Sequence, residues 1–177
     1  MGYVWQVFRD DEADDGIADM DMLEIGTGTM TEFEEQTHLS FWAALKSPLI
    51  IGADITKISN SSLAILLNAE IVAISQDDAG IAATYLPALS TEGSVQVWAG
   101  PLSAGSFEHV ILALNYGANA TNISIPWSGI PQLQNSTRAS YKVRDIWAAK
   151  DLGTITEGIT LTNVSSHQTK VLVISRA

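Results

Sequence analysis

The first half of the chain carries a helical pattern of apolar and polar positions. Thr31 and Glu34 have the spacing of a capping box, which marks the start of a helix. Five side chains then share one face at helical period: Phe33, Thr37, Phe41, Ala44 and Leu45. We therefore predict a helix from about Thr31 to Lys46, which Pro48 ends.

Strand-like and helical stretches continue to alternate after this helix. The run Pro48–Asp54 is apolar almost throughout, which is typical of a buried parallel strand. The stretch Ser59–Glu70 predicts a second helix, with Ser59 or Asn60 as its cap. This rhythm, which extends to about Gly80, is typical of an α/β unit with a parallel sheet.

After residue 80 the pattern changes to short strands. Six stretches either alternate or form short apolar runs: residues 94–100, 109–117, 122–127, 141–147, 158–163 and 170–175. Turn signals separate them at residues 115–119, 128–131 and 151–153. Strands at this spacing predict an antiparallel β-sandwich. We therefore divide the chain into an α/β unit, residues 1–80, and an all-β unit, residues 81–177.

Composition restricts the classes of function. The chain is 46% hydrophobic and 16% charged, as expected of a globular protein that buries a core. Its net charge of −11 and its scattered Lys and Arg residues argue against nucleic acid as a partner. No apolar run approaches the length that spans a membrane. Cysteine is absent, which excludes disulfides, thiolate metal sites and a thiol nucleophile.

Five of the seven asparagines lie in acceptor motifs for N-glycosylation: Asn60, Asn119, Asn122, Asn135 and Asn163. This enrichment predicts a glycosylated, secreted protein that acts outside the cell. The first residues nevertheless lack the basic start and the apolar core of a signal peptide. We therefore expect the front of the protein to be missing from this chain.

Two carboxylates near the start, Asp19 and Asp21, are candidates for chemistry, because glycosidases work with pairs of carboxylates. In an extended chain, residues two apart project from the same side, so both side chains would approach a sugar from one direction. That arrangement suits hydrogen bonds to hydroxyls better than the roles of acid and nucleophile. From the spacing alone, a solvated turn is the simpler interpretation.

We expect neither a metal nor a cofactor. Three histidines lie far apart without metal-ligand spacing: His38, His109 and His167. The acidic run Asp10–Asp15 does not keep the register of a calcium-binding loop. The loop Gly26–Met30 has two glycines but lacks the third glycine of a dinucleotide-binding fingerprint.

Four motifs follow one another in the first half: Asp19-Met20-Asp21-Met22-Leu23, Trp42-Ala43, Pro48–Asp54 and Gln76-Asp77. In this order they resemble the motifs of the α-galactosidases (melibiases) of glycoside hydrolase family 27, particularly the secreted fungal ones. The later stretches VQVWAGPLSAG, VRDIW and SSHQTKVLVIS are similar to the C-terminal β-domain of that family. The resemblance covers about residues 19–177.

The resemblance implies a (β/α)8 barrel followed by an antiparallel β-sandwich. It also implies hydrolysis with retention by two aspartates. Residues 1–80 have room for about two of the eight barrel units, and they match the seventh and eighth. The fourth strand, which carries the nucleophile in the family, is absent. Asp10, four residues after Gln6, has the spacing of the family's acid/base residue. The family, however, has Arg in place of Gln6. The competing interpretation is that this segment is scrambled or spliced in.

The resemblance also assigns the substrate-binding residues. Asp21 and Met22, in the seventh βα loop, would contact the sugar, with Asp19 shaping the same loop, although Ala18 replaces the asparagine of the family. The implied substrates are galactosides and galacto-oligosaccharides with a terminal non-reducing α-D-galactosyl residue. We expect this chain alone to hydrolyse little or none of them. Two barrel units also leave parallel edges exposed, so a partner, such as a second copy in a homo-oligomer, would have to cover them.

A second hypothesis is a non-catalytic module, in which the sandwich from about Ile81 binds carbohydrate or stabilises an assembly. An exposed tryptophan among Trp98, Trp127 and Trp147 would then be the stacking platform. Each of the three lies in a strand-like pattern, which favours positions in the core of the sandwich. Galactoside binding by the sandwich alone would separate the two hypotheses.

Overall fold

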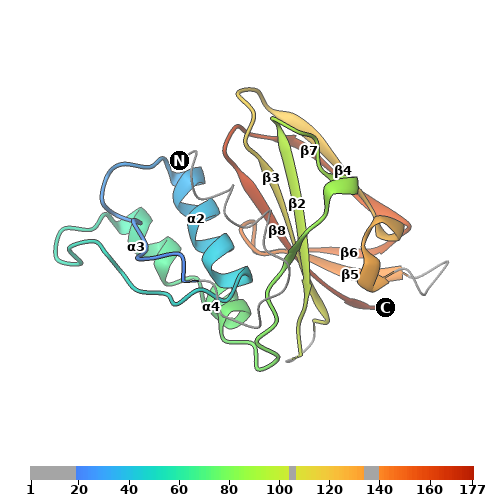
Figure 1. Cartoon of the computed structure of the whole chain (residues 1–177), viewed down its shortest axis with the longest axis horizontal. Helices are drawn as coiled ribbons and strands as arrows, with labels where there is room; N and C mark the ends of the chain where they lie inside the picture. Colours follow the sequence, from blue (N-terminus) through green and yellow to red (C-terminus); the bar gives the residue numbers. More distant parts are fainter. Residues whose placement is uncertain (1–18, 104–106, 134–139) are drawn as a thin grey trace.

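The computed structural model of the chain describes residues 19–103, 107–133 and 140–177. Within these ranges, three α-helices lie together beside an antiparallel β-sandwich (Figure 1): α2 (Glu32–Ala44), α3 (Asn60–Leu66) and α4 (Ala69–Ser75). None of the helices in the described part of the chain is long and apolar enough to cross a membrane. The antiparallel sandwich that the sequence predicts for the second half is present.

Helix α2 begins where the capping box predicts. The Thr31 hydroxyl accepts a hydrogen bond from the Glu34 amide (3.4 Å), and the Glu34 carboxylate accepts one from the Thr31 amide (2.8 Å). The helix ends at Ala44, and Lys46 takes up a left-handed conformation with φ 63°. Nine of the thirteen helical residues are buried. A helix with so little exposed surface has to pack against other elements on more than one side.

The prediction of a buried strand over Pro48–Asp54 is wrong. Among the described residues this run forms a single parallel bridge, between Ile51 and Leu23. Two hydrogen bonds flank the bridge, from Leu23 N to Ile50 O (2.7 Å) and from Gly52 N to Leu23 O (2.9 Å). Ile50 and Ile51 are 53% and 44% exposed. The run has the composition of a buried strand, but the described chain covers it on one side only.

The stretch predicted as one second helix forms two. The Ser59 hydroxyl caps α3 by accepting a hydrogen bond from the Ser62 amide (3.0 Å). The Asn68 side chain then accepts hydrogen bonds from the amides of Glu70 (3.0 Å) and Ile71 (3.1 Å), which starts α4. Asparagine competes for backbone partners in this way, so it favours a cap over a helix interior.

The strands of the described chain form a six-stranded sheet in the order β1-β2-β3-β8-β5-β6 and a two-stranded sheet of β4 and β7. All neighbours are antiparallel. The strands are β1 (Thr84–Tyr85), β2 (Val95–Pro101), β3 (His109–Asn115), β4 (Thr121–Pro126), β5 (Ser140–Asp145), β6 (Lys150–Thr156), β7 (Gly158–Val164) and β8 (Thr169–Arg176). The sequence pattern predicts six of them and misses β1 and β6.

Strand β6 contains the turn predicted at residues 151–153, so that prediction is wrong. The chain turns at residues 146–149 instead, where Ala149 has φ 48°. Gly153, with φ 81°, lies at a bulge, because the register with β5 shifts between Val143 and Arg144. A glycine within a strand marks a bulge as readily as a turn, and here it marks a bulge.

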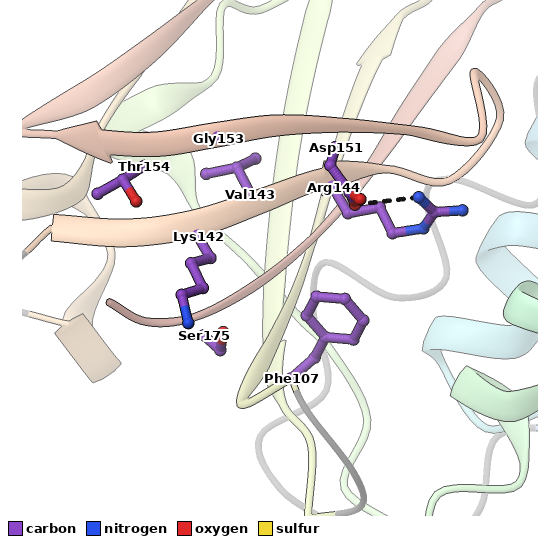
Figure 2. Close-up of a pocket in the computed structure, with 8 residues that line it drawn as sticks. All are labelled: Phe107, Lys142, Val143, Arg144, Asp151, Gly153, Thr154 and Ser175. Carbon is purple, nitrogen blue, oxygen red and sulfur yellow. Dashed lines mark hydrogen bonds and ion pairs between the residues drawn. The ribbon is translucent and has the colours of Figure 1, made fainter.

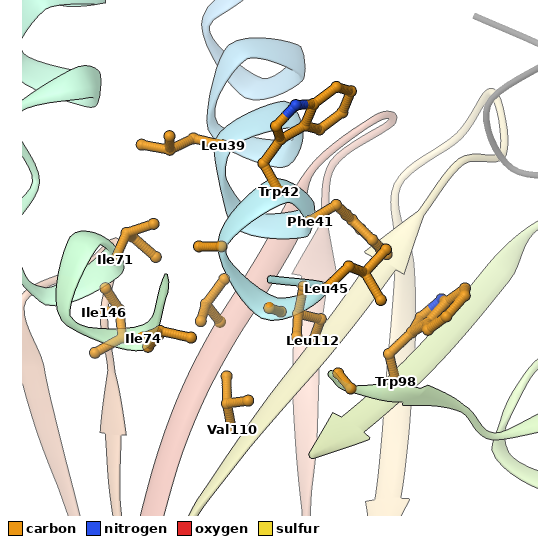
Figure 3. Packing of buried hydrophobic residues seen from close by; sticks show 14 of the residues in the cluster. Leu39, Phe41, Trp42, Leu45, Ile71, Ile74, Trp98, Val110, Leu112 and Ile146 are labelled. Atoms are coloured by element: carbon orange, nitrogen blue, oxygen red, sulfur yellow. The ribbon is translucent and has the colours of Figure 1, made fainter. Parts of the chain in front are cut away.

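The central strands of the six-stranded sheet, β2, β3 and β8, are covered on both faces. Three β3 side chains pack in the apolar cluster that includes α2: Val110, Leu112 and Leu114. The residues between them, Ile111 and Ala113, pack in the cluster that includes β4 and β7. Figure 3 shows Phe41 of α2 and Leu112 of β3 among the residues of the first cluster. The Phe41 ring also meets Trp98 of β2 edge to face, with centroids 5.7 Å apart. The helices and the sandwich therefore share one core.

Polar contacts tie α4 and the residues after it to the sandwich. The buried Asp77 carboxylate accepts hydrogen bonds from the Ser103 amide (2.9 and 3.1 Å), from the Ser103 hydroxyl (3.1 Å) and from the Ala79 amide (3.2 Å). Glu70 of α4 forms a two-pronged ion pair with Arg144 of β5, with N–O distances of 2.6 and 2.9 Å. These contacts fix α4 against the loop after β2 and against β5.

Replacing Asp77 with alanine should lower the free energy of unfolding by about 1–3 kcal/mol, because the Ser103 amide and hydroxyl lose their acceptor. Urea denaturation followed by tryptophan fluorescence measures the change. Asp78 is exposed and provides the matched control. Asp78→Ala should change the free energy of unfolding by less than about 0.5 kcal/mol. Equal losses in the two variants would contradict the role given to Asp77.

Candidate functional site

The loop Asp19–Met22 forms an exposed turn, in agreement with the solvated turn that the spacing of Asp19 and Asp21 favours. The Asp19 carboxylate accepts a hydrogen bond from the Asp21 amide (3.0 Å), and the Asp21 carboxylate accepts one from the Met22 amide (2.7 Å). Asp21 has φ 68°. Short carboxylate side chains bond to the nearby backbone and tolerate this left-handed conformation. Both residues remain exposed.

Helix α2 and the segment that follows it hold the backbone of the loop through two hydrogen bonds. The Trp42 indole donates a hydrogen bond to the Asp21 carbonyl (2.9 Å), and the Met20 amide donates one to the Ser47 hydroxyl (3.0 Å). Leu23, the next residue, is 1% exposed and belongs to the core. The exposed side chains of the loop therefore stand on a backbone that is fixed on both sides.

Met22 projects from this loop with half of its surface exposed. A Cβ built on Gly52 would lie 3.2 Å from the Met22 Cβ and 3.1 Å from the Leu23 carbonyl oxygen. A side chain at position 52 would therefore press on the loop. Carboxylates accept hydrogen bonds from hydroxyls, and a thioether covers an apolar surface. The loop can thus contact both the polar and the apolar parts of a small polyhydroxylated ligand.

His38 supports the loop from the helix. Its ring stacks on Trp42 with centroids 3.7 Å apart, and its Nε2 accepts a hydrogen bond from the Glu24 amide (3.3 Å). Burial lowers the pKa of His38 to about 4, although a hydrogen bond to the Met22 backbone acts in the opposite direction. The ring is therefore neutral near pH 7, and its contacts support a structural role.

Glu35 is a supporting residue that the sequence pattern does not reveal. It is buried, and its Oε1 accepts hydrogen bonds from the Gly26 amide (2.8 Å) and from the Ser62 hydroxyl (3.1 Å). Gly26 has φ 86°, and a Cβ there would lie 2.5 Å from the Ile58 side chain. Glu35 thus holds the backbone at Gly26, and the Ile58 side chain leaves no room there for a larger residue. Helical spacing places Glu35 on α2 without showing that its carboxylate is buried.

The remaining candidate residues lie apart from this loop or outside the described residues. Asp10, the candidate acid/base, and Asn135 fall outside the described residues. The other four sequon asparagines are exposed, as glycan acceptors must be: Asn60, Asn119, Asn122 and Asn163. The Asn163 amide donates to the Asn122 side chain (2.9 Å), so these two are neighbours across β4 and β7. Glycosylation itself stays a prediction. In the described ranges, no cluster of His, Asp and Glu could hold a metal.

The tryptophans of the sandwich belong mainly to its interior. Trp98 and Trp127 are 3% and 4% exposed. Trp147 is partly buried against the core, and its indole donates a hydrogen bond to the Ser40 hydroxyl of α2 (2.9 Å). Trp98 and Trp127 therefore cannot serve as stacking platforms for a sugar.

Family models and relatives match both parts of the chain. A model described as "Alpha galactosidase A" matches residues 6–77, and one described as "Alpha galactosidase C-terminal beta sandwich domain" matches residues 92–174. The α-galactosidase of Lachancea cidri is 40% identical over 146 residues, which are 76% of this chain and 31% of the relative. Alpha-galactosidase 3 of Arabidopsis thaliana is 36% identical over 90% of this chain and 36% of its own length.

Solved structures of α-galactosidases are also similar to this chain. α-Galactosidase I from Mortierella vinacea is 35% identical, with a TM-score of 0.79 over 88% of this chain and 38% of its own. The Saccharomyces cerevisiae α-galactosidase solved with raffinose is 26% identical, with a TM-score of 0.76 over 90% of this chain and 47% of its own. The chain spans about a third of the length of the curated relatives that it matches.

The buried His38 should make the free energy of unfolding depend on pH. The unfolded chain binds the His38 proton below its ordinary pKa of 6.5, whereas the folded chain binds it only below about 4. Stability is therefore fully present above pH 6.5 and is lost as the pH falls towards 4. Between about pH 7 and pH 4.5, the wild type should lose about 2–3 kcal/mol more than His38→Gln, which cannot take up the proton.

Urea denaturation of the wild type and of His38→Gln at the two pH values measures this difference. Carboxylates that titrate in the same range contribute to both proteins, so the comparison isolates His38. If both proteins lose stability equally, the buried neutral state of His38 is contradicted.

Proposed function

We propose that this chain supplies the C-terminal part of a retaining α-galactosidase, because it belongs to the α-galactosidase (melibiase) family, glycoside hydrolase family 27. It corresponds to a C-terminal portion of the members of that family. The substrates would be galactosides and galacto-oligosaccharides with a terminal non-reducing α-D-galactosyl residue. One relative, the Saccharomyces cerevisiae α-galactosidase, is solved with raffinose.

The anchored loop Asp19–Met22 carries this proposal. It presents the exposed carboxylate of Asp21 and the half-exposed thioether of Met22 on a backbone held by Trp42 and Ser47. In the proposal, Asp21 accepts hydrogen bonds from galactose hydroxyls, and Met22 covers the apolar face of the ring. Asp19 holds the turn through its bond to the Asp21 amide. Asp10 stays a candidate acid/base on the basis of its spacing alone.

We propose further that residues 19–80 form the last two units of a (β/α)8 barrel. The parallel bridge between Leu23 and Ile51 supports this. So does the distribution of large exposed apolar side chains, which all lie between residues 22 and 81 of the described chain: Met22, Phe33, Ile50, Ile51, Ile55, Leu63, Leu67 and Ile81. An apolar surface confined to one part of a protein marks an interface. The other barrel units of an α-galactosidase are the partner that this surface would contact.

The chain alone should therefore not hydrolyse a chromogenic α-galactoside. Co-expression with the part of the Mortierella vinacea α-galactosidase that precedes the matched region should restore hydrolysis, because that part would supply the missing units. In the restored enzyme, Asp21→Ala should lower activity about ten-fold or more, as expected for the loss of a charge-assisted hydrogen bond. Glu32→Gln, which changes an exposed carboxylate on α2, should leave activity unchanged.

Two outcomes would overturn these proposals. Turnover by the chain alone at the rate of a full-length relative would refute the fragment proposal. An effect of Asp21→Ala no larger than that of Glu32→Gln would refute the sugar contact at the loop.

The sequons extend the proposal to a secreted, extracellular glycoprotein. The four sequon asparagines in the described part of the chain lie on its surface, where a glycan can be attached. The mass of the chain secreted by a yeast host, before and after enzymatic removal of N-glycans, tests this. An unchanged mass would count against it.

A further inference from the structure

The sandwich has a groove that shares no residue with the loop Asp19–Met22. It lies on β5, β6 and β8, has a volume of about 470 Å³, and is shown in Figure 2. The side chains that give it its chemistry are Phe107, Lys142, Arg144, Asp151, Thr154 and Ser175. This volume lies in the range of natural small-molecule sites. The groove combines one aromatic wall with several hydrogen-bonding groups.

A row of polar side chains crosses the groove on three neighbouring strands. Lys142 of β5 pairs in register with Thr154 of β6 on one side and with Ser175 of β8 on the other. Residues in register point to the same face of a sheet, so the side chains of Lys142, Thr154 and Ser175 share one face. Lys142 takes part in none of the ion pairs between described residues, and Figure 2 shows its ammonium reaching towards Ser175. The row therefore has donors and acceptors available for a ligand.

Arg144 is held in place at the end of this row. Its guanidinium pairs with Glu70 at 2.6 and 2.9 Å and with Asp151 at 3.0 Å, the second contact being drawn in Figure 2. These carboxylates compensate the charge of Arg144 and fix its position, so Lys142 is the cation without an ion pair among the described residues that line the groove. The chain as a whole carries a charge of −11. A polyanion would be repelled by that field, which favours a neutral ligand rich in hydroxyls.

Phe107 supplies the apolar wall. It is partly buried against the core cluster, and Figure 2 shows its ring beside Arg144 at the edge of the groove. A pyranose has an apolar face of C–H groups and a rim of hydroxyls. An aromatic ring next to a row of Lys, Thr and Ser side chains matches both features. Trp98 and Trp127, which are buried, cannot provide such a wall.

We propose that this groove binds a hexopyranose unit of an oligosaccharide. Phe107 packs against the C–H face of the sugar, while Lys142, Thr154 and Ser175 bond to its hydroxyls. This site is independent of the proposed catalytic role, because none of its residues belongs to the loop Asp19–Met22.

The test is a titration of the ¹⁵N-labelled full chain with galactose and with raffinose, followed by NMR. Saturable shifts are expected at the amides of Gly153, Thr154 and Ser175. Lys142→Ala and Phe107→Ala should each weaken binding about ten-fold or more, since each removes a group that contacts the sugar. The matched control is Lys150→Ala, which should bind normally. Lys150 is an exposed lysine at the start of β6 and does not line the groove.

Two further variants keep the test decisive. Thr154→Val changes an exposed side chain and should also weaken binding, so it replaces Phe107→Ala if that variant does not fold by circular dichroism. Asp21→Ala should leave the shifts at the groove unchanged. The proposal is overturned if neither sugar gives saturable shifts at these amides, if Lys142→Ala binds as tightly as Lys150→Ala, or if Asp21→Ala abolishes the binding.

Discussion

The burial of the central strands β2, β3 and β8 on both faces of the six-stranded sheet is the constraint on which the rest of the structure depends. One face is covered by the two-stranded sheet of β4 and β7, and the other by α2. Each large apolar side chain taken out of water contributes about 1.5–3 kcal/mol. Removing α2 would therefore expose many such side chains at once. Polar groups of α2 also bond to the sandwich: the Thr37 hydroxyl donates a hydrogen bond to the His167 carbonyl (2.8 Å).

The position of α2 also determines the geometry of the loop. The same helix that packs Phe41 against the sheet directs His38 and Trp42 towards the loop, where the indole holds the Asp21 carbonyl. The sandwich therefore stabilises the helix that holds the backbone beneath the exposed carboxylates of Asp19 and Asp21. This explains how a loop of short polar side chains keeps a defined shape, and it links the sugar-binding role proposed for Asp21 to packing far from it in the sequence.

The sequence predicts the elements whose signals are local. The capping box gives the start of α2, and the alternating runs give six strands of the sandwich. It predicts poorly what depends on neighbours: the run Pro48–Asp54 reads as a buried strand, but Ile50 and Ile51 face solvent because the described chain covers one side only. The left-handed conformation of Asp21 and the buried carboxylate of Glu35 depend on contacts that spacing does not encode. Motif resemblance, rather than periodicity, directs attention to the loop.

Native-state hydrogen exchange tests the shared core most directly. If α2 and the sheet are one cooperative unit, the amides of residues 37–44 in α2 should exchange with the same opening free energy as those of β3 and β8. If α2 instead exchanged through a low-energy opening while β3 and β8 stayed protected, the sheet would be stable without the helix, and the account would be contradicted.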